Sequence, residues 1–228
     1  MRPSRRGRLI LLACASGTLW LRAAPAEERT PQGPGNPDRG AAIAHHGTAS
    51  GVPACEECHS VIGQQVGEDV SPALAGQSPY YLAKQLKDFA TGQRQNPVMT
   101  PIAEALSSGE RSDVAAFYAS RTPPALPLPT GSEPLPWQGR ILARAGDREK
   151  AIQACNNCHG PDGAGEWPAI PYLAGQSPAY LALELRKWRT GLRRNDGGQQ
   201  MAVIAGRLDD ADIDAVAAYF AAPASINR

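Results

Sequence analysis

Apolar side chains recur at helical spacing in two stretches of the chain, each of which follows a Ser-Pro pair. In both stretches the apolar positions are i, i+4 and i+7, so they share one face of a helix. These positions are Leu82, Leu86 and Phe89 in the first stretch and Leu181, Leu185 and Trp188 in the second. Ser78 and Ser177 are suitable N-caps before a proline at the first helical position, and Gly92 and Gly191 are suitable stops. The pattern predicts one helix in each stretch.

Capping signals and apolar spacing predict further helices in the same order along both parts of the chain. Capping boxes begin at Ser107 and Asp209, each in front of a segment with apolar residues. Another helix is predicted near residues 38–46, with a counterpart near 138–152. The sequence shows no sustained alternation of apolar and polar residues of the kind that strands require. These patterns together predict an all-α fold.

The two helical parts are copies of one unit. Residues 72–79 and 171–178 are identical at seven of eight positions, at an offset of 99. A repeat of about 100 residues is a duplicated domain, because the units of solenoids run from about 20 to 50 residues. A segment with six prolines separates the copies, and it favours an extended, semi-rigid path. We therefore predict a signal peptide at 1–26, a first domain at 27–121, a Pro-rich linker at 122–139 and a second domain at 140–228.

Residues 1–26 have the three parts of an export signal. An arginine-rich start is followed by an apolar run and by a small-residue cleavage site at Ala24-Pro25-Ala26. The apolar run falls short of the ~20 residues that span a bilayer, and an uncleaved anchor is the alternative. The segment holds five arginines and no acid, so the remaining chain has 18 basic and 22 acidic residues. This acidic balance argues against nucleic-acid binding, which needs a basic face to neutralise phosphates.

The four cysteines outside the signal form two copies of a Cys-x-x-Cys-His motif. One copy consists of Cys55, Cys58 and His59, and the other of Cys155, Cys158 and His159. This spacing is the signature of c-type haem attachment. Two thiols form thioethers with the vinyl groups of a porphyrin, and the following histidine ligates the iron. A zinc site would leave both histidines unexplained, and disulfides within Cys-x-x-Cys are unusual as stabilisers. We therefore predict two covalently bound haem c groups.

Two methionines occupy matching places in the two copies. Met99 follows the first motif histidine by 40 residues, and Met201 follows the second by 42. Methionine is usually a core residue, but the matched positions and the shortage of other methionines favour axial ligation of iron. We expect each to lie in a loop between two helices. His/Met ligation raises the reduction potential and fills the iron, which disfavours peroxide binding.

His45 and His46 are the only other histidines, and they have no counterpart in the second copy. They are interpreted as a solvated pair near a helix end. The alternative is a further iron or metal ligand, since imidazole serves both purposes.

Over residues 38–222 the sequence resembles the class I cytochromes c, and most closely the two-haem cytochrome c4 family. The resemblance rests on the paired Cys-x-x-Cys-His motifs, the Pro-x-Leu-Ala-Gly-Gln elements and the segment around Met201. It implies two tandem cytochrome c-like domains, each a small helical fold around one haem. It also implies that the carbonyls of Pro72 and Pro171 accept hydrogen bonds from the δ nitrogens of His59 and His159. Such partners orient a ligating imidazole and raise its basicity.

The resemblance further implies a periplasmic one-electron carrier of a respiratory chain, commonly associated with the membrane. Its redox partners would be a quinol-oxidising complex or a dehydrogenase as donor and a terminal oxidase as acceptor. A two-haem peroxidase is the first alternative, but the symmetric methionines argue against an open iron. A cytochrome subunit of a membrane-bound dehydrogenase or oxidase complex is the second. Glu56 and Glu57 stand where the second motif has Asn156 and Asn157. Because negative charge favours ferric iron, we predict the lower potential at the first haem.

Overall fold

The structure is a computed structural model, and it describes residues 34–59, 71–123 and 137–222. The predicted export signal and most of the Pro-rich segment lie outside these residues, so both stay predictions. Within the described ranges the chain is helical, apart from two isolated antiparallel bridges at Asp147–Ile152 and Glu166–Ile170. The predicted all-α class is therefore confirmed. None of these helices combines the length and the apolar character that a membrane span needs.

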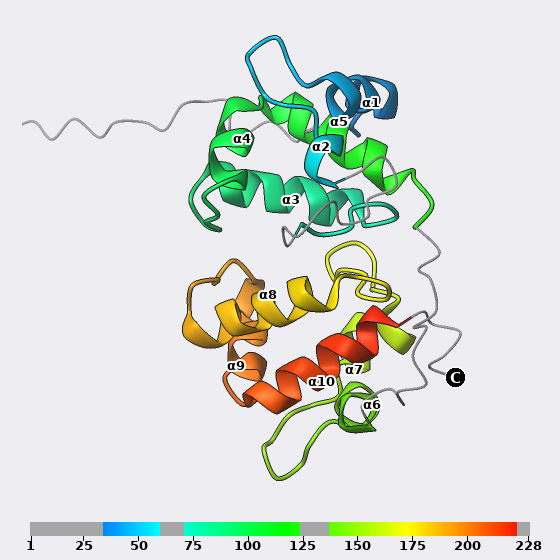
Figure 1. Ribbon diagram of the computed structural model, residues 1–228, viewed down its shortest axis with the longest axis vertical. Helices are drawn as coiled ribbons and strands as arrows, with labels where there is room; N and C mark the ends of the chain where they lie inside the picture. Colours follow the sequence, from blue (N-terminus) through cyan, green and yellow to red (C-terminus); the bar gives the residue numbers. More distant parts are fainter. Residues whose placement is uncertain (1–33, 60–70, 124–136, 223–228) are drawn as a thin grey trace, which may run out of the picture. The chain divides into compact units, whose positions relative to one another are not determined.

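The helices follow one another in the same order in both halves of the chain (Figure 1). The first half contains α1 (Pro37–His46), α2 (Glu56–His59), α3 (Pro79–Ala90), α4 (Met99–Ala105) and α5 (Ser108–Ala119). The second half contains α6 (Trp137–Arg144), α7 (Asn156–His159), α8 (Pro178–Thr190), α9 (Gln200–Ala205) and α10 (Asp210–Ala221), with 3-10 turns η2 (Pro161–Gly163) and η3 (Gly197–Gln199). This correspondence is what the duplication of the sequence predicts.

The predicted caps hold the helix ends. Ser78 accepts a hydrogen bond from the third residue of α3, and Ser177 does the same for α8. Both capping boxes form, at Ser107 for α5 and at Asp209 for α10. Gly191 has a left-handed backbone conformation at the end of α8, as is usual for a glycine that ends a helix. The sequence therefore specifies the ends of the long helices locally.

Two predictions about helix extent are wrong. The helix expected near 138–152 begins at Trp137, inside the predicted linker, and ends at Arg144. It stops there because Gly146 takes a positive φ of 74° and the chain then turns back to pair Asp147 with Ile152. The methionines also do not lie in loops: Met99 begins α4, and Met201 is the second residue of α9. These helices are too short, at 7 and 6 residues, to produce a clear periodic pattern.

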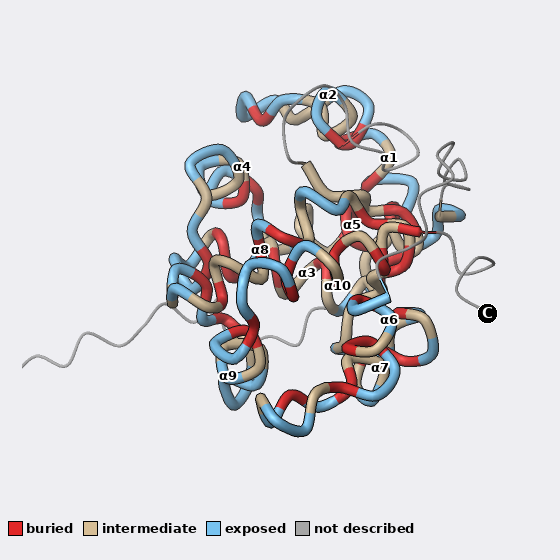
Figure 2. Tube along the Cα trace, turned by 60° about the horizontal axis from the view of Figure 1, so that its bottom comes forward, coloured by how far each residue is buried: buried red, intermediate tan, exposed pale blue. Residues whose placement is uncertain are grey.

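Each half has its own hydrophobic core, built where its first helix crosses its last. A Cβ on Gly40 of α1 would lie 2.0 Å from the carbonyl oxygen of Asp113 in α5, and one on Gly139 of α6 would lie 2.1 Å from that of Ala215 in α10. Only glycine permits these two close crossings. Figure 2 shows that α5 and α10 are more deeply buried than α4 and α9. The leucines of the predicted apolar faces pack against these cores: Leu82 and Leu86 of α3, and Leu181 and Leu185 of α8.

A buried polar cluster joins the two halves. Arg94 donates to Gln85 of its own half at 2.8 Å and to Glu184 of the other half at 2.9 Å. Arg193 mirrors it, with bonds to Glu184 at 2.7 Å and to Gln85 at 3.1 Å. All four side chains are less than one-tenth exposed. Gln85 and Glu184 are equivalent positions of the repeat, so one carboxylate stands between two guanidinium groups.

Candidate functional site

Each Cys-x-x-Cys-His motif forms a single helical turn, α2 or α7. The backbone N–H of His59 donates to the carbonyl of Cys55 at 2.9 Å, and the second motif repeats this bond at the same distance. None of the four motif cysteines forms a disulfide. Burial raises the pKa of both Cys55 and Cys155 to about 11, so these thiols are neutral. In each half, a single helical turn therefore presents two thiols and one imidazole.

The two motif histidines are buried and held by a backbone carbonyl. Nδ1 of His59 lies 2.9 Å from the carbonyl oxygen of Pro72, and Nδ1 of His159 lies 3.0 Å from that of Pro171. These are the two bonds that the resemblance implied. Because a carbonyl only accepts, each Nδ1 carries the proton and each Nε2 keeps its lone pair. Burial lowers the pKa of both histidines, although the carbonyl bond opposes it. A neutral imidazole with a free Nε2 is the form that binds a metal.

The loops that provide these carbonyls are fixed to the last helix of their own half. Gly76 has a φ of 74° and donates its N–H to the carbonyl of Tyr118 at 3.0 Å. Gly175 has a φ of 76° and donates to the carbonyl of Phe220 at 2.7 Å. The glycine of the repeated Leu-Ala-Gly-Gln element thus allows the left-handed turn that anchors the loop.

The two methionines are half-buried, and each is fixed through its backbone amide. Asn96 Oδ1 accepts from Met99 N at 2.9 Å, and Asp196 Oδ2 accepts from Met201 N at 2.6 Å. A side chain of the preceding loop therefore sets where each short helix begins. The second half places a carboxylate at this point and the first half an amide.

The first motif has two glutamates where the second has asparagines, and one of these glutamates is paired with a histidine. Glu56 Oε1 lies 2.8 Å from Nδ1 of His45, at the end of α1. His45 also packs edge-on against Phe117, with ring centroids 5.6 Å apart. Both His45 and His46 are exposed at the last turn of α1, as expected of a helix end, but His45 pairs with Glu56 and is not simply solvated. Among the described residues, no group of three or more His, Cys, Asp or Glu side chains is arranged to hold a metal ion.

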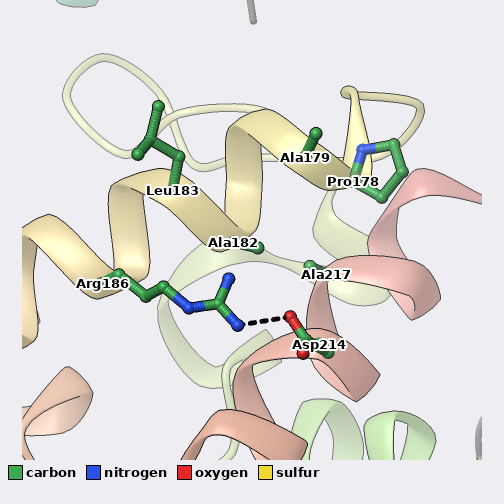
Figure 3. A pocket seen from close by; sticks show the side chains of 7 residues that line it. All are labelled: Pro178, Ala179, Ala182, Leu183, Arg186, Asp214 and Ala217. Atoms are coloured by element: carbon green, nitrogen blue, oxygen red, sulfur yellow. Dashed lines mark hydrogen bonds and ion pairs between the residues drawn. The ribbon is translucent and has the colours of Figure 1, made fainter.

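A depression of about 490 Å³ lies between α8 and α10, away from these groups (Figure 3). Its lining consists of Pro178, Ala179, Ala182, Leu183, Arg186, Asp214 and Ala217. Arg186 Nη2 bonds Asp214 at 2.7 Å across it. None of the candidate residues lines this depression, so it has no part in the site.

The residues present fit a covalently bound haem c in each half. The two thiols of each motif stand one helical turn apart, beside a buried imidazole in the metal-binding tautomer. The fit rests on the donor set and on the carbonyl-held imidazole, which is an arrangement typical of metal-ligating histidines.

A helical fold that presents such an imidazole directly behind a pair of thiols is that of a class I c-type cytochrome. The cytochrome c family model matches residues 149–222. The "thiosulfate dehydrogenase electron acceptor" of Stutzerimonas stutzeri (strain A1501) is 42% identical over 168 residues, which are 74% of this chain and 78% of that protein.

Two solved structures are also similar. The crystal structure of reduced recombinant cytochrome c4 from Pseudomonas stutzeri has a TM-score of 0.72 and 31% identity, and the match covers 83% of this chain and 99% of the other. Thiosulfate dehydrogenase from Marichromatium purpuratum, in its "as isolated" form, has a TM-score of 0.75 and 40% identity. That match covers 81% of this chain but only 39% of the dehydrogenase chain.

The chain belongs to the cytochrome c4 family. It is a c-type cytochrome with covalently bound haem c and serves as an electron carrier between redox proteins. Its relatives are named cytochromes c4 or electron acceptors, so the chain is an electron-transfer protein and not an enzyme.

Proposed function

We propose that the chain holds two haem c groups, one in each half. Cys55 and Cys58 attach the first, with His59 and Met99 as its axial ligands. Cys155, Cys158, His159 and Met201 do the same for the second. The observation that carries this proposal is the repeated carbonyl-held imidazole, at 2.9 Å in one half and 3.0 Å in the other.

When bound, each haem supplies a one-electron ferric/ferrous couple. The protein's own residues set the potential and the orientation of this couple. The carbonyls of Pro72 and Pro171 hold the imidazole rings and increase their basicity, which favours ferric iron. The methionine thioethers favour ferrous iron and occupy the sixth position, which supports electron transfer over peroxide chemistry.

The chain functions, in this proposal, in the periplasm after export by residues 1–26. Its donor is a dehydrogenase, and the names of the relatives favour a thiosulfate dehydrogenase. A quinol-oxidising complex is the other donor expected of the family, and the acceptor is a terminal oxidase, with peripheral association at the membrane. The net charge of −4 that remains after removal of the signal favours a basic partner.

Reconstitution with a purified thiosulfate dehydrogenase tests the donor. Thiosulfate and a catalytic amount of the dehydrogenase should reduce the oxidised cytochrome by two electrons per chain, followed by visible absorbance. Omission of the dehydrogenase is the control. A cytochrome that dithionite reduces fully but thiosulfate and the dehydrogenase do not would contradict the proposed donor.

A further inference from the structure

The repeated Leu-Ala-Gly-Gln element ends in a glutamine that crosses from one half of the molecule to the other. Gln176 Oε1 accepts from the N–H of Ala73 at 2.8 Å, and Gln176 Nε2 donates to the carbonyl of Ala73 at 3.0 Å. Gln77 forms the mirrored pair with Tyr172, at 2.9 Å and 2.8 Å. Both glutamines are 7% exposed. Each side chain therefore clamps one backbone position of the opposite half at two points.

The clamped N–H belongs to the peptide unit that holds the axial histidine. The peptide bond between Pro72 and Ala73 contains both the carbonyl that binds His59 Nδ1 at 2.9 Å and the N–H that donates to Gln176. The second half repeats this chain of bonds. His159 Nδ1 lies 3.0 Å from the carbonyl of Pro171, and the N–H of the same peptide unit donates to Gln77.

Hydrogen bonds in such a chain polarise one another. A peptide unit whose N–H is bonded has a more negative carbonyl oxygen, so it is a stronger acceptor. A stronger acceptor at Nδ1 makes the imidazole more basic at Nε2 and favours ferric iron. The burial of both glutamines removes competing water, which makes the effect larger than on an exposed surface.

On the basis of the two-haem function proposed above, we propose that each glutamine is a positioning residue for the haem of the opposite half. Gln176 lowers the potential of the first haem through the Pro72–Ala73 peptide unit. Gln77 lowers the potential of the second haem through the Pro171–Tyr172 peptide unit. The contact between the halves thereby sets the potential of both haems as well as joining the domains.

The test compares Gln176→Met with Gln77→Met, which keep side-chain length but remove both polar groups. Site-resolved redox titration, with NMR assignment of the two haems, should show a crossed pattern. Gln176→Met should raise the first potential, and Gln77→Met the second. We expect a change of about threefold in the redox equilibrium of the affected haem, which is about 30 mV at 59 mV per tenfold. The amide of Ala73 should also exchange its hydrogen faster in Gln176→Met, and that of Tyr172 in Gln77→Met.

Gln176→Glu and Gln77→Glu provide the matched control. A carboxylate keeps the acceptor for the peptide N–H but loses the donor to the carbonyl of Ala73 or Tyr172. Because the stronger acceptor and the negative charge both favour ferric iron, the potential of the opposite haem should return to the wild-type value or fall below it. If the glutamines only held the domains together, the Glu variants would change the potential of the opposite haem in the same direction as the Met variants. If the Met variants do not fold, Gln176→Ala and Gln77→Ala are titrated in their place, and the same crossed pattern of raised potentials is the deciding result.

The haem content of every protein is measured first by mass spectrometry. A wild-type protein with fewer than two haems overturns both this inference and the proposed function. Two haems with equal shifts at both, a shift only at the haem of the substituted half, or no shift overturn this inference alone.

Discussion

The carboxylate between the two arginines should dominate the stability of the contact between the halves. Glu184 is 6% exposed and accepts bonds from Arg94 at 2.9 Å, Arg193 at 2.7 Å and Lys187 at 2.9 Å. Although burial alone would raise the pKa of Glu184, Arg94 and Arg193 hold it below its ordinary value. Glu184→Gln keeps the shape and one acceptor oxygen for the two arginines, but it removes the charge and replaces the oxygen that accepts from Lys187 with an NH2 donor.

The loss can be worked out from the three bonds. A hydrogen bond to a charged group is worth about 1.5–3 kcal/mol and a neutral one about 0.5–1.5, so each arginine bond should lose about 1 kcal/mol when the carboxylate becomes an amide. The bond from Lys187 is lost, and because this side chain is partly exposed to water that loss should add about 1 kcal/mol. The total of about 3 kcal/mol agrees with the ~3–5 kcal/mol typical of breaking a buried ion pair from one side. For a chain of this length that corresponds to a fall in Tm of about 6–12 °C.

Urea and thermal unfolding of the haem-loaded protein, followed by circular dichroism, measure this loss. Asp214→Asn is the control, because it removes the exposed partner of Arg186 and should change little. The double variant Gln85→Glu/Glu184→Gln moves the charge to the equivalent position, where Gln85 already accepts from both arginines. It should recover part of the loss, because the new carboxylate keeps both arginines but shares the amide of Asn195 with Asp88 instead of gaining Lys187. Unchanged stability in Glu184→Gln, or no recovery in the double variant, would show that the buried charge does not stabilise the contact between the halves.

The pH dependence of stability follows from the same carboxylate. Because the folded-state pKa of Glu184 is depressed, its contribution is present above the unfolded-state pKa of about 4.3 and is lost as the pH falls through the folded value. Three other predictions accompany it. Replacing Met99 or Met201 by Ala should abolish the sulfur-to-iron charge-transfer band of one haem, and an unchanged absorption spectrum would exclude that methionine as a ligand. Glu56→Gln with Glu57→Gln should raise the potential of the first haem in a redox titration, because carboxylates there favour ferric iron. Gly139→Ala should cost about 1–3 kcal/mol in urea unfolding by forcing α6 away from α10, whereas Gly109→Ala, with open space around its Cβ, should not.

The sequence predicted the features that depend on local chemistry. The caps of α3, α5, α8 and α10 are each set by one side chain and its nearest amides, so Ser78 or Asp209 identifies a helix start without tertiary information. The Cys-x-x-Cys-His turn is equally local. Its histidine partners, Pro72 and Pro171, came from the family resemblance, because a carbonyl 13 or 12 residues away leaves no periodic signal.

What the sequence did not predict depends on the pairing of the two halves. In the sequence, Gln77 and Gln176 were visible only as part of the repeat. Their hydrogen bonds join residues that are 95 and 103 positions apart in the chain. The asymmetric pair of Gln85 and Glu184 is visible in the alignment of the repeats, but its burial between two arginines is a tertiary fact. The duplication was the available signal, because Gln77 and Gln176 are identical residues at equivalent places just before α3 and α8.

Mass spectrometry of the exported protein under denaturing conditions counts the haems, because only covalently attached haem survives unfolding. We expect a polypeptide that begins after Ala26 and carries the mass of two haems. In Cys55→Ala/Cys58→Ala and in Cys155→Ala/Cys158→Ala we expect one haem each. A wild-type mass with one haem or none would show that the chain is not a two-haem cytochrome.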